Sequence, residues 1–95
     1  IYYERKDLVK AKEFINKSIN LTELLFGKYY IGMINNLVLL GEIEVKEGLL
    51  VQAAETLNKA LEICQKLHGI NHASTNKIQM FLETVNRLKN SSDTN

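Results

Sequence analysis

Two histidines, His68 and His72, are four residues apart, the spacing that would place two metal ligands on one face of a helix. Gly69 lies between them, however, and glycine commonly ends a helix in a left-handed turn. No further ligands stand beside the pair to complete a metal site. We therefore predict that the two histidines have a capping or turn role, and that the chain has no metal site.

Other residues of types that can take part in catalysis also lack partners. Glu42, Glu44 and Glu47 fall on one predicted helix without a histidine or serine beside them, so we expect a solvated acidic face. The single cysteine, Cys64, is expected to be a small core residue, since no catalytic partner is identifiable around it. No glycine-rich phosphate loop occurs. The sequence predicts no catalytic residue and no cofactor.

Composition narrows the class of protein further. The chain has 95 residues, of which 45% are hydrophobic, and this length suits one small domain. Its 12 basic and 11 acidic residues are mixed along the sequence and leave a net charge of +1, which gives no electrostatic reason to expect a nucleic acid or an anionic membrane as partner. There is no signal peptide and no apolar run long enough to span a membrane. Together with the lone cysteine, these features predict a cytoplasmic protein.

The segment from Gly48 to Gly69 is the most strongly patterned part of the chain. Small and apolar residues recur at spacings of three and four, which predicts an amphipathic helix between two glycines. The short alanines should lie where a neighbouring helix comes close, and the longer leucines should pack against its side chains. The residues on this stripe are Leu50, Ala53, Leu57, Ala60, Leu61, Cys64 and Leu67.

Three further helices are expected, with breaks near Gly27, Gly48 and Gly69, and no strand. The first runs from Leu8 to Phe26, after a turn; its expected buried side consists of Leu8, Ala11, Phe14, Ile15, Ser18, Ile19, Leu21, Thr22 and Leu25. The second, between Gly27 and Gly48, buries Ile34, Leu37, Leu40, Gly41 and Ile43. The last buries Ile78, Phe81, Leu82, Val85 and Leu88.

The sequence also predicts a close helix contact, a helix cap and a polar tail. Glycine in a helix costs about 1 kcal/mol relative to alanine, so we expect Gly41 to allow the close approach of another backbone. Asn71 and Ser74 are alternative N-caps for the last helix. Residues 1–89 form the helical domain, and residues 90–95 are a polar C-terminal tail that we expect to be frayed.

The chain also contains an internal repeat, with a period of about 42 residues. Sliding the chain along itself until Gly27 falls on Gly69 superimposes Ala11 on Ala53 and Ile15 on Leu57. The further pairs are Leu8 with Leu50, Lys17 with Lys59, Ser18 with Ala60, Ile19 with Leu61, Leu21 with Ile63, and Leu25 with Leu67. Because the chain starts with Ile1 inside a structural unit, we expect it to be a fragment of a longer protein.

The repeated pattern resembles a tetratricopeptide repeat. The complete repeat comprises Leu37, Leu40, Gly41, Gly48, Leu50, Ala53, Leu57, Ala60 and Leu61, and the back half of a preceding one comprises Tyr2, Leu8, Ala11, Ile15, Ser18 and Ile19. The long repeat period is similar to that of kinesin light chains, and SET-MYND methyltransferases carry similar C-terminal segments. The resemblance implies an all-α fold of antiparallel helix pairs stacked as an α-solenoid, with about one and a half repeats and a C-terminal capping helix.

The resemblance also implies a function. First helices in this family line a concave groove that receives a peptide of a partner protein, and the repeats perform no chemistry. Chaperone-binding members of this family hold a C-terminal carboxylate with lysine and asparagine in the groove. Val38 and Glu42 stand at two of those places, which argues against such a clamp. The expected peptide-binding residues are Asn35, Val38, Glu42, Val45, Lys46, Lys77, Met80 and Thr84. The alternative is an accessory domain of a larger methyltransferase-like enzyme whose active site lies outside these residues.

One end of such a stack would be incomplete. Solenoid units usually need about three neighbours to bury their faces. Leu8, Phe14 and neighbouring apolar residues should be exposed where a preceding helix is missing. We therefore expect a marginally stable monomer, or self-association through that end.

Overall fold

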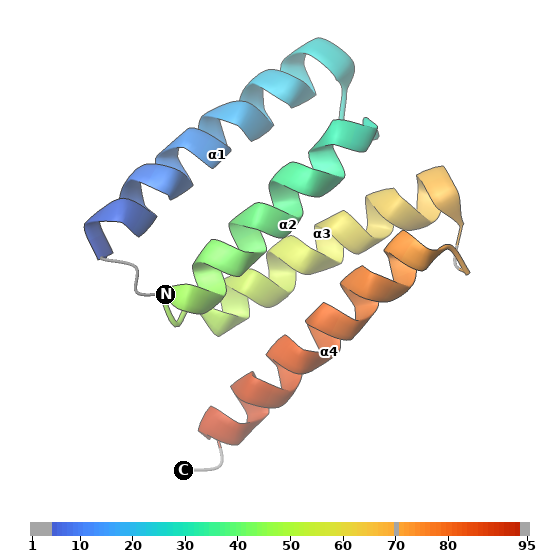
Figure 1. Cartoon of the computed structure of the whole chain (residues 1–95). Coiled ribbons are helices and arrows are strands. Elements are labelled where there is room, and N and C mark those ends of the chain that lie inside the picture. Colours follow the sequence, from blue (N-terminus) through green and yellow to red (C-terminus); the bar gives the residue numbers. More distant parts are fainter. Residues whose placement is uncertain (1–4, 70, 94–95) are drawn as a thin grey trace.

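The computed structural model describes residues 5–69 and 71–93, and these residues form four helices without a strand. The helices are α1 (Arg5–Phe26), α2 (Ile31–Lys46), α3 (Leu50–His68) and α4 (Ala73–Asp93). Each helix packs against the next one in the sequence, and the chain reverses direction at every turn between them (Figure 1). The predicted all-helical fold is confirmed.

The three predicted breaks are confirmed as well, at Gly27, Gly48 and Gly69. All three have positive φ, a region that glycine enters without steric cost. Gly27 donates its amide to the carbonyl of Glu23, and Gly69 donates to that of Gln65, each at 2.9 Å. The two helices α1 and α3 therefore end in the same way, one repeat period apart.

Helix boundaries follow the same period at a second place. α2 begins at Ile31, and α4 begins one repeat period later, at Ala73. The N-terminus of α1 does not follow the period, because it starts at Arg5 instead of Leu8 and the turn expected before Leu8 is helical from Arg5 onward. Arginine and lysine are good helix formers, and neither glycine nor proline interrupts this segment. Tyr2 lies outside the described residues.

The fourth helix extends further than its apolar pattern. It continues through Asp93 and so includes the first residues of the polar C-terminal segment that we expected to be frayed. Residues 94–95 of that segment lie outside the described part of the chain.

α3 lies at the centre of the core, because it packs against α2 on one side and α4 on the other. Two buried clusters meet on it, one formed mainly with α2 and one mainly with α4. Leu50 and Leu61 are only partly buried and Leu67 is exposed, so the buried part of the predicted stripe is smaller than expected. The buried residues of α3 are Ala53, Ala54, Thr56, Leu57, Ala60, Ile63 and Cys64.

The flanking helices bury most of their predicted residues. On α2, Ile34, Leu37, Leu40 and Gly41 are buried, and Ile43 is half-buried. On α4, Ile78, Leu82 and Val85 are buried, Phe81 is half-buried and Leu88 is exposed. The predicted positions that are not fully buried are Ile43, Phe81 and Leu88.

α1 has no fully buried side chain among its described residues. Phe14, Leu21 and Leu25, which we placed on its buried side, are exposed, whereas Ile15 and Ile19 are half-buried. α1 packs mainly against α2, so the stripe of apolar residues is wider than the face that this neighbour covers. The expected exposure of Phe14 is confirmed; Leu8 is half-buried.

Gly41 permits a close approach, as predicted, but the neighbour is a side chain and not a backbone. A β-carbon placed on Gly41 would lie 2.9 Å from Cδ2 of Leu57. Leu57 has no exposed surface, so its terminal methyl groups have no open space into which they could retreat.

The solvated acidic face predicted on α2 is wrong for two of its three residues. Only Glu42 is exposed. Glu44 is 6% exposed and accepts a hydrogen bond of 2.6 Å from the hydroxyl of Thr56 on α3. Glu47 pairs with Lys12 of α1 at 3.1 Å. These residues link α2 to both of its neighbours, which a helical period alone does not reveal.

Removing the donor to Glu44 should destabilise the fold. Thr56→Val keeps the shape of the side chain but leaves the buried carboxylate without this hydrogen bond, at an expected cost of about 1–3 kcal/mol in the free energy of unfolding. Adding Glu44→Leu should recover much of the loss, because a pair of apolar groups needs no hydrogen bond. Urea unfolding followed by circular dichroism measures both variants. The matched control is Thr84→Val at an exposed position; an equal loss there would contradict the assignment.

The contact at Gly41 predicts an energetic coupling between α2 and α3. Gly41→Ala gains about 1 kcal/mol in helix propensity but forces a methyl group against Leu57, at about 1–3 kcal/mol. We expect a net loss of stability, and a smaller cost for Leu57→Ala in the Gly41→Ala background than in the parent chain. A double-mutant cycle from denaturant unfolding measures the difference. Asn58→Ala, at an exposed position of α3, is the control; equal stabilisation by Asn58→Ala and Gly41→Ala would refute the contact.

Candidate functional site

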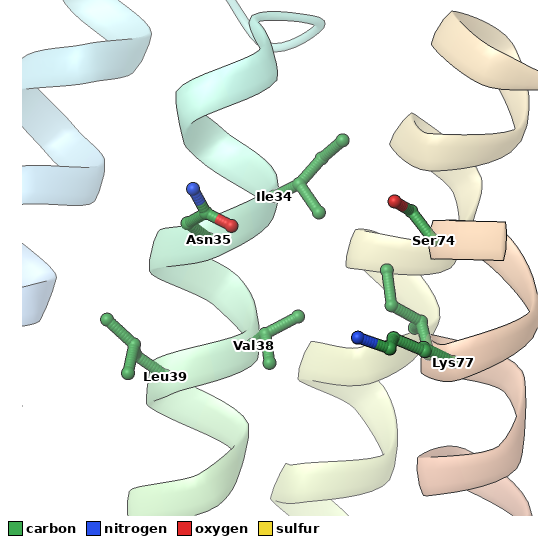
Figure 2. A pocket seen from close by; sticks show the side chains of 7 residues that line it. Ile34, Asn35, Val38, Leu39, Ser74 and Lys77 are labelled. Atoms are coloured by element: carbon green, nitrogen blue, oxygen red, sulfur yellow. The ribbon is translucent and has the colours of Figure 1, made fainter.

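A hollow of about 550 Å³ opens between α2 and α4, with α3 behind it (Figure 2). It arises because α2 and α4 both pack on α3 and leave space between them. α2 supplies Ile34, Asn35, Val38 and Leu39, and α4 supplies Ser74, Lys77 and Ile78.

The floor of the hollow is aliphatic and its rim is polar. Ile34 and Ile78 are buried and belong to the same core cluster, while half-buried Val38 packs against that cluster. In Figure 2 the side chains of Ile34 and Val38 point toward α4, and the amino group of Lys77 points back toward α2. An apolar group could therefore sit on the floor while a polar group reaches the rim.

Polar groups of three kinds are available at the rim. Asn35 offers an amide, Ser74 a hydroxyl and Lys77 an ammonium group, and no acidic residue lines the hollow. The one formal charge on the lining is thus positive. This arrangement favours an occupant with an aliphatic group beside a hydrogen-bond acceptor or a carboxylate.

Three of the eight predicted peptide-binding residues line the hollow, namely Asn35, Val38 and Lys77. The other five lie further along α2 and α4. Glu42, Lys46, Met80 and Thr84 are exposed, and Val45 is half-buried against the second core cluster. The Thr84 hydroxyl donates to the Met80 carbonyl at 3.0 Å, within its own helix.

The sequence did not indicate four lining residues, Ile34, Leu39, Ser74 and Ile78, as part of the site. Two of them, Ile34 and Ile78, were correctly predicted to be core residues, but a core side chain can also form the floor of a hollow. Ser74 was expected to cap a helix instead of standing inside its first turn. Leu39 gives no sequence signal, since it lies off the apolar stripe of α2.

The predicted capping role of the histidine pair is confirmed for His72. α4 begins at Ala73, so His72 is its N-cap, with Nδ1 accepting from the backbone N–H of Ser74 at 3.1 Å. Its carbonyl accepts from the amide of Asn76, also at 3.1 Å. The alternative caps, Asn71 and Ser74, are therefore wrong. They lie on either side of the cap because sequence fixes a helix start only to within a residue or two.

His68 lies beside this cap. The two imidazole rings stack with their centroids 4.5 Å apart. Within residues 5–69 and 71–93, no group of three or more His, Cys, Asp or Glu side chains has the arrangement to hold a metal ion.

Cys64 is a core residue, as predicted. It is fully buried with a free thiol, and its Sγ lies 3.4 Å from the hydroxyl of Thr75. That hydroxyl also donates to the carbonyl of Gly69 at 2.8 Å. The turn between α3 and α4 is thereby tied to the core next to the hollow.

A smaller hollow, of about 240 Å³, lies where α1, α2 and α3 meet. At its edge Lys28 pairs with Glu62 at 3.2 Å, and this hydrogen-bonded carboxylate raises the pKa of Lys28. Two ammonium groups lie near the Tyr29 ring, with Nζ of Lys66 4.7 Å and Nζ of Lys28 5.4 Å from its centroid. All of these groups are solvent-exposed, so the pairings contribute little to stability.

No helix in the described part of the chain is both long and apolar enough to cross a membrane. Comparison with known proteins finds no matching family model, no matching curated protein and no matching solved structure.

The cap at His72 should contribute measurably to stability. His72→Ala removes the acceptor of the Ser74 amide and is expected to lower the free energy of unfolding by about 1 kcal/mol. His72→Asp should retain most of the stability, because aspartate is a good N-cap and its charge suits a helix N-terminus. Thermal unfolding by circular dichroism measures both. His68→Ala serves as control for the ring stacking, and equal losses in His72→Ala and His72→Asp would show that the cap is not the cause.

Proposed function

We propose that this chain is a non-catalytic, tetratricopeptide-like module that binds a segment of a partner protein in the hollow between α2 and α4. The observation that carries the proposal is the lining itself, an aliphatic floor with an amide, a hydroxyl and an ammonium group at its rim. The volume of about 550 Å³ lies within the usual range of ligand-binding clefts.

The repeat period supports the helical-repeat interpretation. Asn35 and Lys77 are separated by one repeat period, and both line the hollow from the first turns of α2 and α4. The two helices therefore present equivalent positions to one shared space. An arrangement of this kind suits a binding surface that is built by repetition.

Binding fits the lining better than catalysis does. No histidine, cysteine, aspartate or glutamate is among the lining residues, so the usual general bases and acids are missing from it. The free, buried thiol of Cys64 suits the reducing conditions of a cytoplasmic protein.

The chemistry of the rim defines the class of peptide. An aliphatic side chain on the floor would place its neighbouring residue near Lys77, where an aspartate or glutamate would be favoured. We propose that a longer peptide continues past the hollow along Glu42 and Lys46 on α2 and along Met80 on α4. Met80, with 67% of its surface exposed, would then be an apolar contact for the far part of the peptide.

Peptides selected from a random displayed library on the 95-residue chain test the proposal. We expect aliphatic residues next to acidic ones to be enriched. Lys77→Glu should weaken selected peptides by more than about 1 kcal/mol, the threshold at which an interface residue is considered important. Fluorescence anisotropy with terminally blocked peptides measures the affinity. The matched control is Lys17→Glu, which makes the same charge change on α1 and should leave affinity unaltered.

A second pair of changes tests the extent of the site. Glu42→Lys combined with Met80→Asp alters both helices beyond the hollow and should weaken long peptides by more than about 1 kcal/mol, without loss of helicity. If neither this pair nor Lys77→Glu changes affinity, the groove assignment is wrong. An accessory domain of an enzyme would instead select no peptide when isolated and would change turnover when deleted from its parent.

A further inference from the structure

α1 carries an apolar stripe that no described residue covers. It consists of Phe14, Leu21 and Leu25, which are 70%, 56% and 62% exposed. Their spacing of seven and four residues places them along one line of the helix. We call these three residues the α1 stripe.

The internal repeat shows what covers the corresponding stripe on α3. Phe14 corresponds to Thr56, and Leu21 to Ile63. Both α3 residues are buried on the side of α2, since Thr56 bonds Glu44 and Ile63 shares a core cluster with Met33 and Leu37 of α2.

The opposite face of α1 follows the same correspondence. Thr22 of α1 lies against α2, with its hydroxyl 3.5 Å from the amide nitrogen of Asn36. Its equivalent on α3 is Cys64, which contacts Thr75 of α4. α1 therefore packs on α2 as α3 packs on α4, and Phe14 and Leu21 occupy the place that on α3 receives α2. Leu25 corresponds to Leu67, which is exposed on α3 as well.

The outer face of α4 cannot fill this place from a second copy of the chain. The α2 residues that face α3 include Leu37, Gly41 and Glu44, through the core cluster and the contacts with Leu57 and Thr56. Their equivalents on α4 are polar. These are Gln79, Glu83 and Asn86. A head-to-tail contact would thus lay a polar face on the apolar α1 stripe.

We propose that the α1 stripe is the docking surface for a partner α-helix that repeats the apolar pattern of α2 but carries a small apolar residue where α2 has Glu44. Phe14 is the reason why the partner helix should differ from α2 at the position of Glu44. At the equivalent place, Thr56 donates a hydrogen bond to the Glu44 carboxylate, whereas a phenyl ring has no donor and occupies more volume. A carboxylate at that place would be buried without its partner. This proposal is independent of the peptide site between α2 and α4.

Two synthetic peptides provide the probe. One has the sequence of residues 30–47, and the other is the same peptide with Glu44→Ala. Fluorescence anisotropy with the 95-residue chain should give an affinity for the Glu44→Ala peptide about tenfold higher than for the unchanged one. Leu21→Asp in the chain should weaken the Glu44→Ala peptide by about tenfold or more, with the helical circular dichroism spectrum unchanged because Leu21 is exposed.

The decisive variant is Phe14→Thr. It supplies the hydroxyl that α3 has at the equivalent position, so the preference should reverse and the unchanged peptide should bind better than the Glu44→Ala peptide. A purely structural disturbance of α1 would weaken both peptides alike and would not reverse their order.

Three results would overturn the proposal. The first is the same affinity order for the parent chain and Phe14→Thr, and the second is binding that Leu21→Asp does not alter. The third is dimerisation of the chain in sedimentation experiments that Phe14→Asp abolishes, with neither peptide binding. In that case the occupant of the α1 stripe is a second copy of the chain, paired α1 to α1.

Discussion

The double-sided burial of α3 is the constraint on which the rest of the structure depends. A helix covered by neighbours on two sides needs short side chains where they approach, and Ala53, Ala60 and Cys64 provide them without any exposed surface. Leu57 then fits against α2 where Gly41 has no side chain. A wider residue at either place would separate the two helices and open the core.

The candidate peptide site is a consequence of this packing. Because α2 and α4 both pack on α3, this common packing sets their separation and thereby forms the hollow between them. The caps of the helices contribute as well. The hydrogen bonds of His72 and Thr75 fix the start of α4, and so set the positions of Ser74 and Lys77 on the rim. A site whose walls are set by core packing has a low conformational cost of binding.

The two ends of the helix array differ in chemistry. The residues of α4 that correspond to the α3-facing residues of α2 are polar, namely Gln79, Glu83 and Asn86. α1 presents Phe14, Leu21 and Leu25 outward instead. Exposed apolar stripes of this width are characteristic of interaction surfaces. The positions of α4 that would meet a further helix are thus polar, whereas the α1 stripe offers an apolar surface to one.

The number of helices and the three glycine breaks could be predicted from the sequence, because helical periodicity and the positive φ of Gly27, Gly48 and Gly69 are local properties, whereas the start of α1 and the end of α4 could not. The internal repeat was equally readable, and it carried over into the boundaries of the helices. Which apolar faces are covered depends on the packing of the helices against one another. Phe14 and Ile15 are adjacent and belong to the same apolar pattern. Yet Phe14 is exposed, whereas Ile15 is half-buried. Glu44 and Glu42 carry the same charge on the same helix, but only Glu44 is buried. It faces α3, where Thr56, 12 residues away in the sequence, donates a hydrogen bond to it. The lining of the hollow is of the same kind. It depends on the distance between α2 and α4, which neither segment specifies and which their common packing on α3 imposes.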